Sequence, residues 1–414
     1  MKLGTPLLRY IVAAIIVVVL GGLGGWYMFI NKQIGSTEAQ DTARGYGEAE
    51  TFGGGIGGTI NNLVGDVIGG ILSNDKGPSA ASAPKLWQIT RTPVAGHGFA
   101  SSSPRLYFAE RASGNVLLAD PTTTNVQRLT NTLIPKVLEA YFATDGSVVL
   151  RSLDDDGKIQ SYAARIATST SPAAGDTPNK LEGAFLPEGI VSMGVHSTPD
   201  ELFFIVRENS GSAGIVSGWL GGNQKRTLVS ALSDWQAIFL QDGSKYLVQK
   251  ASDDVAGYAF KITGSGSLER VMGDLPGLII LPRSNSQAML FSTASAGQIA
   301  LFARVNSQTS DVRLAIRTLA EKCVWAPDTR LIAYCAVPQT APSGTILRDR
   351  YDGSAHTADA WWRVDVSANT AEQIYTPEIS VALDVENPQI NSAGTHIAFM
   401  NGTDKTLWML TLNK

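Results

Sequence analysis

Residues 323–335 read CVWAPDTRLIAYC: a short apolar run, a Pro-Asp turn and a second short apolar run. Runs of this length on either side of turn residues are typical of two antiparallel β-strands joined as a hairpin. The same order returns with turns near residues 102, 145, 199, 242, 285, 328 and 393. Four of the six intervals are about 43 residues, a period typical of the blades of a β-propeller.

Each copy continues with two further strand-like runs, for example NVLLAD at 115–120 and VQRLT at 126–130. Four strands in a repeat of this length describe one blade. The last copy ends in TLWMLTLNK at 406–414, which supplies a third strand but no fourth, whereas KLWQIT, from Lys85, resembles a fourth strand without its first three. We therefore expect an all-β, seven-bladed propeller over residues 86–414, in which the N-terminal strand completes the last blade and removes an open sheet edge.

One copy carries a recognisable signature. WAPDTRLIAY, residues 325–334, resembles the W-[SA]-P-D-G-x-x-[IL]-A-[YF] repeat of TolB-like, WD-like propellers, with Thr329 where that family usually has glycine. The resemblance implies that Trp325, Pro327 and Asp328 pack the blade and form its turn, and do not bind a ligand. The layout of the chain also resembles membrane-anchored bacterial surface propellers of unknown activity.

The N-terminal region contains one long apolar run, YIVAAIIVVVLGGLGGWYMFI, at residues 10–30. Its length suits a bilayer core of roughly 30 Å. Lys2 and Arg9 precede it and acidic residues dominate after it, so the positive-inside rule places residues 1–9 in the cytoplasm. We expect an uncleaved signal anchor, a single transmembrane helix in the lipid bilayer of the cytoplasmic membrane, with the propeller outside, in the periplasm or at the cell surface. A cleaved signal peptide is the alternative, although the run is longer than the core of such peptides.

Residues 31–85 are rich in Gly, Ser, Ala and Asp and are predicted to form a linker. Within it, residues 58–73 place apolar side chains at helical spacing, which predicts a short amphipathic segment weakened by its glycines. A loose linker with scattered apolar residues is the alternative. Together with the Gly21 and Gly25 pair of the apolar run, this segment suggests weak homo-oligomerisation.

The two cysteines of the chain, Cys323 and Cys335, stand at equal distances from Thr329 at the centre of the predicted hairpin. In a non-hydrogen-bonded antiparallel pair the Cα atoms are about 4.5 Å apart, which a disulfide can bridge. Disulfides persist outside the reducing cytosol. We predict a disulfide between them; two buried, reduced cysteines are the alternative.

The interval between the sixth and seventh turns is about 65 residues, because an insert at residues 339–360 separates the second and third strands of blade six. Arginine and aromatic residues are enriched in binding hot spots. The candidate partner-binding residues in and after the insert are Arg348, Asp349, Arg350, Tyr351, Asp352, Asp359, Trp361 and Trp362. In the alternative interpretation the two tryptophans are strand residues, one in the core and one between blades, and the loop is a cap.

Motifs for chemistry are sparse. The net charge of -4 offers no basic stripe for nucleic acid. The chain has no G-x-S-x-G and no H-E-x-x-H, and His97, His196, His356 and His396 fall in different blades, so we expect no catalytic, metal or cofactor site. SLDDDGK at 152–158 is interpreted as a solvated turn and not as a calcium loop.

These patterns favour a non-enzymatic, membrane-anchored extracytoplasmic propeller that binds or scaffolds an envelope protein or peptide. Two alternatives remain open at the level of the sequence. One is a propeller hydrolase or lyase with carboxylates around the channel, and the other is a self-associating structural protein of the cell envelope.

Overall fold

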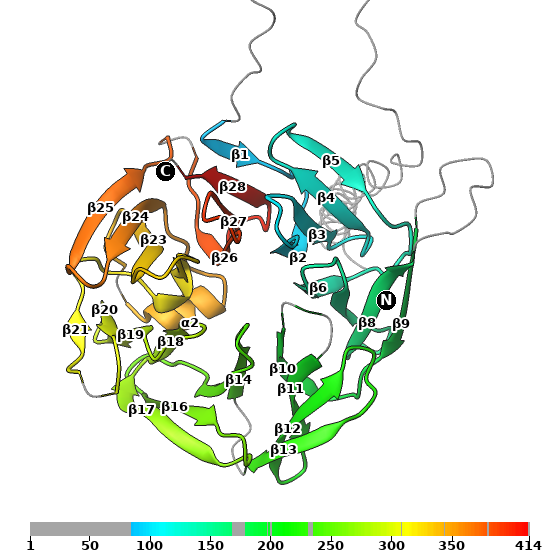
Figure 1. Ribbon diagram of the computed structural model, residues 1–414, viewed down its shortest axis with the longest axis horizontal. Coiled ribbons are helices and arrows are strands. Elements are labelled where there is room, and N and C mark those ends of the chain that lie inside the picture. Colours follow the sequence, from blue (N-terminus) through cyan, green and yellow to red (C-terminus); the bar gives the residue numbers. More distant parts are fainter. Residues whose placement is uncertain are drawn as a thin grey trace, which may run out of the picture. The chain divides into compact units, whose positions relative to one another are not determined.

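The computed structural model describes residues 84–412, apart from 168–178, 197, 199–200, 231–234, 308, 343 and 379–380. Seven antiparallel sheets of four strands each form a ring (Figure 1), which confirms the predicted seven-bladed propeller. The predicted transmembrane helix, linker and amphipathic segment lie outside the described residues. Among the residues that are described, no helix has the length and apolar character needed to cross a membrane.

In blades 1 to 6 the four strands pair in the order of the sequence. Blade 1 contains β2 (Val94–Phe99), β3 (Leu106–Glu110), β4 (Val116–Asp120) and β5 (Asn125–Arg128). Blade 2 contains β6 (Val137–Phe142), β7 (Val148–Leu153), β8 (Ile159–Ala167) and β9 (Lys180–Phe185). Blade 3 contains β10 (Ile190–Val195), β11 (Glu201–Glu208), β12 (Gly211–Gly218) and β13 (Lys225–Ser230). Blade 4 contains β14 (Trp235–Phe239), β15 (Lys245–Gln249), β16 (Ala256–Ile262) and β17 (Leu268–Pro276).

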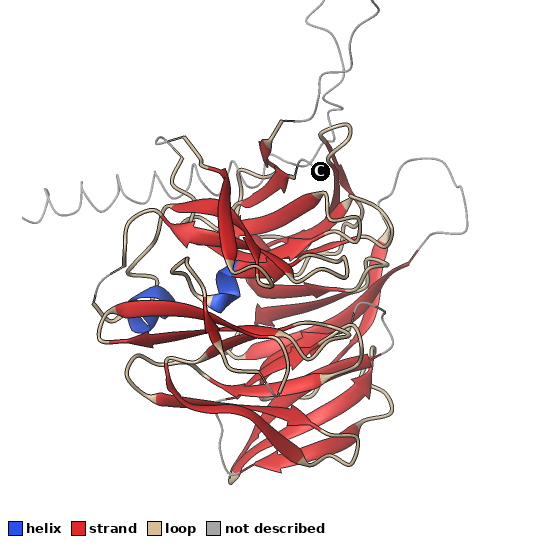
Figure 2. Ribbon diagram, turned by 60° about the vertical axis from the view of Figure 1, so that its left-hand side comes forward, coloured by secondary structure: helices blue, strands red, loops and turns tan. Residues whose placement is uncertain are grey.

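The remaining blades carry the two short helices of the described residues. Blade 5 contains β18 (Ile279–Pro282), β19 (Met289–Ser295), β20 (Gln298–Arg304) and β21 (Val312–Arg313). The 3-10 helix η1 (Ala320–Lys322) leads into blade 6, which contains β22 (Cys323–Trp325), β23 (Ile332–Pro338), α2 (Ile346–Tyr351), β24 (Asp359–Asp365) and β25 (Thr370–Tyr375). Blade 7 contains β26 (Val385–Ile390), β27 (His396–Asn401), β28 (Leu407–Thr411) and β1 (Leu86–Gln88). Strands joined by loops and turns form the body, and helix is confined to two short segments of the described residues (Figure 2).

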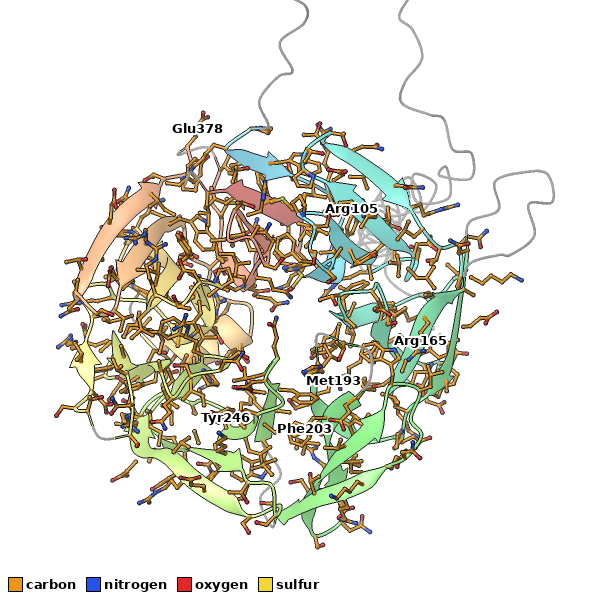
Figure 3. The ribbon with its side chains drawn as sticks, in the orientation of Figure 1. Arg105, Arg165, Met193, Phe203, Tyr246 and Glu378 are labelled. Atoms are coloured by element: carbon orange, nitrogen blue, oxygen red, sulfur yellow. A yellow bond between two sulfur atoms is a disulfide. The ribbon has the colours of Figure 1, made fainter. Side chains whose placement is uncertain are left out.

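Apolar side chains fill the layers between neighbouring blades. Met193 and Phe203, on the inner strands of blade 3, are buried, whereas Arg165 and Glu378 lie at the outer rim of the ring (Figure 3). All six residues of β2 are buried, and a Cβ placed on Gly96 would lie 2.0 Å from the carbonyl oxygen of Ala140 in β6. Blades 1 and 2 therefore approach so closely that only glycine fits at this position.

Hydrogen bonds in or near the turns between the first and second strands tie blades 3, 4, 5 and 6 to one another across one repeat. His196 Nε2 lies 2.9 Å from the carbonyl oxygen of Gln241, and the backbone amide of Asn285 donates to Asp242 Oδ2 at 2.7 Å. Trp325 Nε1 donates to the carbonyl oxygen of Leu281 at 3.0 Å. The partners are 43 to 45 residues apart, so the period seen in the sequence is also the period of these contacts.

The ring closes as the sequence predicts. β1 pairs antiparallel with β28 and places Leu86 opposite Leu410 and Gln88 opposite Trp408. The backbone amide of Ile89 extends this pairing by donating to the carbonyl oxygen of Leu407 at 2.8 Å. The N-terminal strand therefore covers an edge of blade 7 that would otherwise be open.

The predicted disulfide is present in blade 6. Cys323 and Cys335 lie opposite each other in the pairing of β22 with β23, with their Cα atoms 4.0 Å apart, and their sulfur atoms are bonded. The bridge lies three residues before the end of β23, where the insert begins. It therefore fixes the stem from which the insert leaves the blade.

His97 generates a prediction about the closure between blades 7 and 1. Its imidazole is 1% exposed and lies beside the backbone of Ala398, and burial lowers the pKa of His97 to about 4. Because the pKa of His97 in the folded protein lies below the usual value of 6.5, the unfolded chain binds the proton first as the pH falls. The free energy of unfolding is therefore highest above pH 6.5 and decreases as the pH drops towards 4. We expect the wild type to lose about 2 kcal/mol more than His97→Leu between pH 8 and pH 5 in urea denaturation. Equal losses of unfolding free energy in the wild type and in His97→Leu would contradict this role of His97. So would a near-surface control variant, His196→Asn, that reduces the loss as much as His97→Leu does.

Candidate functional site

The long insert of blade 6 packs onto the body of the propeller. It leaves β23 after Pro338, contains α2 and returns at Asp359, and Figure 1 shows α2 on the inner side of blade 6. The side chain of Asp253, between β15 and β16 of blade 4, accepts hydrogen bonds from the backbone amides of Leu347 and Arg348, each at 3.0 Å. Leu347 is fully buried. The insert is thus anchored as far away as blade 4.

A buried lysine lies under the insert. Lys322, the last residue of η1, is 1% exposed, and its Nζ donates to Asp359 Oδ2 at 2.5 Å, Asp384 Oδ1 at 2.6 Å and Thr357 Oγ1 at 2.7 Å. An ammonium group has three donors, so all of its hydrogen-bonding capacity is used. A charge removed from water needs such partners, because an unpaired buried ion is strongly destabilising.

Asp384 is the centre of the charged network. It precedes β26, is 1% exposed, and its backbone amide donates to Asn401 Oδ1 at 3.0 Å. Arg350 Nη1 lies 2.8 Å from Oδ1 and His356 Nδ1 lies 3.0 Å from Oδ2. Burial alone would raise the pKa of the Asp384 carboxyl, but Lys322 and Arg350 hold this pKa well below its usual range. Asp384 is therefore a carboxylate and only accepts hydrogen bonds.

Arg350 joins the insert to this network. Its side chain turns inward from α2, with Nε 2.8 Å from Glu321 Oε1, Nη1 2.8 Å from Asp384 Oδ1 and Nη2 3.3 Å from the carbonyl oxygen of Val385. Burial opposes the charge on Arg350, but the carboxylates of Glu321 and Asp384 outweigh burial and raise the pKa of Arg350. One guanidinium thus connects the insert to the segments that lead into blades 6 and 7.

Two adjoining pockets lie at the insert, one of about 360 Å³, called the inner lobe, and one of about 710 Å³, called the outer lobe; together they are called the cavity. Arg350 and His356 line both lobes and form the wall between them. The rest of the inner lobe is mainly apolar, with Ile299, Leu319, Pro338, Ala341, Pro342, Ile346 and Ala358 among its lining residues. The rest of the outer lobe is polar and charged, with Glu321, Tyr351, Asp352, Gly353, Glu386, Asn387, Gly402, Thr403 and Lys405. Such a volume suits a small ligand or a few residues of a peptide.

His356 is held in one orientation. Because ionised Asp384 cannot donate, the 3.0 Å contact with Asp384 Oδ2 requires a proton on Nδ1 of His356. In the neutral imidazole this leaves Nε2 as a hydrogen-bond acceptor. The side chain is 35% exposed, so the ring is accessible from the cavity.

The predicted partner-binding residues of α2 and of the position after it lie in different environments, in solvent, within the insert or at the cavity. Arg348 points into solvent, with 77% of its side chain exposed, and Asp352, just after the helix, is 66% exposed although it lines the outer lobe. Asp349 accepts a hydrogen bond from Thr345 Oγ1 at 2.9 Å, within the insert itself. Arg350, Tyr351 and Asp352 line the outer lobe.

The last three predicted residues belong to the blade itself. Asp359 is buried against Lys322. Trp361 is fully buried, with its ring 5.3 Å from that of Phe399 in blade 7, and Trp362 packs against the apolar cluster shared with blade 5. Because Trp361 has no exposed surface, it offers no contact to a partner, and both tryptophans are strand residues as in the alternative interpretation.

The sequence analysis did not identify the residues that organise the cavity. Lys322 and Asp384 lie in links between blades, and His356 was named only as one of four histidines in different blades. One signal was available, because Lys322 stands directly before an apolar inner strand. Its two acidic partners, however, lie 37 and 62 residues further along the chain.

The carboxylates of the site do not form an open acid pair. A Cβ on Gly402 would lie 2.6 Å from Asp384 Oδ2 and 3.0 Å from Glu386 Oε1, so both carboxylates flank this glycine. Asp384 is nevertheless inaccessible and paired with cations, and Glu386 pairs with Lys405 at 2.6 Å. Within the described part of the chain, no group of three or more His, Cys, Asp or Glu side chains is placed to hold a metal ion. The arrangement supports ligand binding by apolar contact and hydrogen bonds.

Comparison with known proteins supports the fold. No protein-family model matches the chain, and no curated protein sequence matches it. An oligogalacturonate lyase from Vibrio parahaemolyticus is similar in structure, with a TM-score of 0.52 and 10% identity over 80% of this chain and 94% of that one. A streptogramin B lyase has a TM-score of 0.42 and 13% identity over 79% of this chain and 97% of that one. At 10% identity the likeness to the oligogalacturonate lyase shows the β-propeller fold alone.

The role of Lys322 can be tested by Lys322→Met, which keeps the length of the side chain but removes its charge. We expect a loss of about 3 to 5 kcal/mol of unfolding free energy, because Asp359 and Asp384 keep their charges in the interior without the ammonium group. Adding Asp359→Leu should recover part of this loss. The measurement is urea denaturation at pH 7, with the exposed Lys158→Met as the control. A loss no larger than that of the control would show that the network does not stabilise the fold.

Proposed function

We propose that the protein is a binding module and that its ligand site is the two-lobed cavity beneath the insert of blade 6. The observation that carries this proposal is that Arg350 fixes the insert through Glu321 and Asp384, so the cavity exists before any ligand arrives. A preorganised site avoids the entropic cost of ordering a loop on binding. Loops held on a rigid scaffold are a common location of binding sites.

We further propose that the module works outside the cytoplasm, anchored through residues 10–30. The apolar run, the positive charges before it and the linker after it support this location. The disulfide between Cys323 and Cys335 is consistent with an oxidising compartment. The partner is then a protein or peptide of the cell envelope.

A second candidate is an enzyme, a hydrolase or lyase acting in the same cavity. The observation in its favour is the pair of His356 and Asp384, because a carboxylate that orients an imidazole is a common arrangement in general acid–base catalysis. Among the described residues no hydroxyl is hydrogen-bonded to the His356 imidazole, and Oδ1 of Asp384 is occupied by Lys322 and Arg350. We therefore place binding first.

The binding proposal is tested by a photo-crosslinking amino acid at Thr340, which lines the inner lobe. In intact cells we expect a crosslinked adduct from Thr340, and none from Ser265 in the exposed turn between β16 and β17. Ala341→Trp should abolish the adduct, because the indole fills the inner lobe. Protease added to spheroplasts should digest both the adduct and the propeller.

Two results would contradict the proposal. Equal crosslinking from Thr340 and Ser265 would mean that the cavity has no special affinity. An adduct that persists unchanged in a folded Ala341→Trp variant would place the contact outside the cavity. A propeller protected from protease would reject the extracytoplasmic location alone.

A further inference from the structure

We infer that the cavity binds a peptide segment in which a branched aliphatic residue stands next to lysine or arginine, with the aliphatic side chain in the inner lobe and the cation in the outer lobe beside His356. This inference rests on the proposed binding function. It goes further, because it assigns a chemistry to each lobe and a recognition role to one histidine.

The inner lobe selects for apolar groups. Most of its lining side chains are aliphatic or prolyl, and its one fully buried cation, Lys322, has all three donors engaged by Thr357, Asp359 and Asp384. A polar ligand group would therefore find few partners there and would lose its hydrogen bonds to water. An aliphatic side chain loses nothing polar and gains from burial.

The wall between the lobes presents an acceptor. Because Asp384 fixes the proton on Nδ1 of His356, the neutral ring offers Nε2 to a ligand as an acceptor, and no described residue of the protein hydrogen-bonds to this atom. A ligand group beside it must therefore donate. Ammonium and guanidinium groups are the strongest donors that a peptide carries.

Charge in the outer lobe also favours a cation. Its lining holds three carboxylates, Glu321, Asp352 and Glu386, against two cations, Arg350 and Lys405. Arg350, 10% exposed, pairs with Glu321, 30% exposed, and Lys405, 29% exposed, pairs with Glu386, 26% exposed, so Asp352 is the carboxylate in excess. The lining thus carries one negative charge in excess, so a positive group adds attraction where an acidic group would meet repulsion.

The experiment measures binding of four acetylated, amidated tetrapeptides to the disulfide-bonded full chain by isothermal titration calorimetry. They are Ala-Leu-Lys-Ala, the same peptide with norleucine for lysine, the same with glutamate for lysine, and Ala-Ser-Lys-Ala. We expect Ala-Leu-Lys-Ala to bind at least tenfold more tightly than each of the others. 1,5-Diaminopentane serves as a fifth probe. If it binds as tightly as the best peptide, recognition of a cation in the outer lobe is supported, but the ligand is a small amine and not a peptide.

Variants separate recognition from structure. His356→Phe keeps a ring but removes the acceptor, and we expect it to weaken Ala-Leu-Lys-Ala at least tenfold. Because the variant also removes the Nδ1 donor to Asp384, its unfolding midpoint should fall by a few degrees, so binding is measured well below that midpoint. The matched control His196→Phe, at a turn far along the chain from the insert, should leave binding unchanged. If both variants weakened binding of the peptide equally, His356 would have no specific part in recognising it.

Three results would overturn the inference. They are norleucine binding as tightly as lysine, glutamate binding more tightly than lysine, and no binding of any peptide at 1 mM. In the last case an adduct from Thr340 that Ala341→Trp abolishes would show that the cavity binds a ligand of another class, so the proposed function would survive. Absence of both signals would reject the two together.

Discussion

Lys322 keeps an ammonium group in the interior of the propeller, within 2.6 Å of both Asp359 and Asp384. Such a charge is tolerated only when its partners are fixed, because the loss of water must be offset by short, well-directed contacts. The partners come from β24 and from the segment before β26, so the requirement holds the start of blade 7 against blade 6. The charged groups around the cavity take their positions from this contact.

Asp384 transmits the constraint to the insert. Its two oxygens serve Lys322 and Arg350 on one side and His356 on the other, and Arg350 in turn belongs to α2. The insert is therefore positioned by charge as well as by the buried Leu347, and the disulfide of Cys323 and Cys335 fixes the strands from which it departs. A pocket built in this way combines a rigid floor with an accessible wall, which is the arrangement that preorganised recognition requires.

The architecture could be predicted from the sequence, and the site only in part. Blades repeat, so their period, the β1 strand that closes blade 7 and the pairing of Cys323 with Cys335 follow from local patterns and spacing. The insert was also located, with Arg350 and Tyr351 among its candidate residues. The roles of Lys322, Asp384 and His356 could not be predicted, because they depend on contacts between different blades, which no local sequence pattern encodes. Trp361 was misleading for the same reason, since an aromatic in a strand looks alike in the sequence whether it is buried or exposed.

The central claim is that charge pairing holds the insert closed over a cavity that already exists in the free protein. Hydrogen exchange of the unliganded protein, followed by mass spectrometry over residues 339–358, tests this claim most directly. The account predicts that the amides of Leu347 and Arg348, bonded to Asp253, and that of Gln339, bonded to Ala358, exchange as slowly as those of the neighbouring strands. Complete exchange of the whole segment within seconds would show an open loop and would contradict the account.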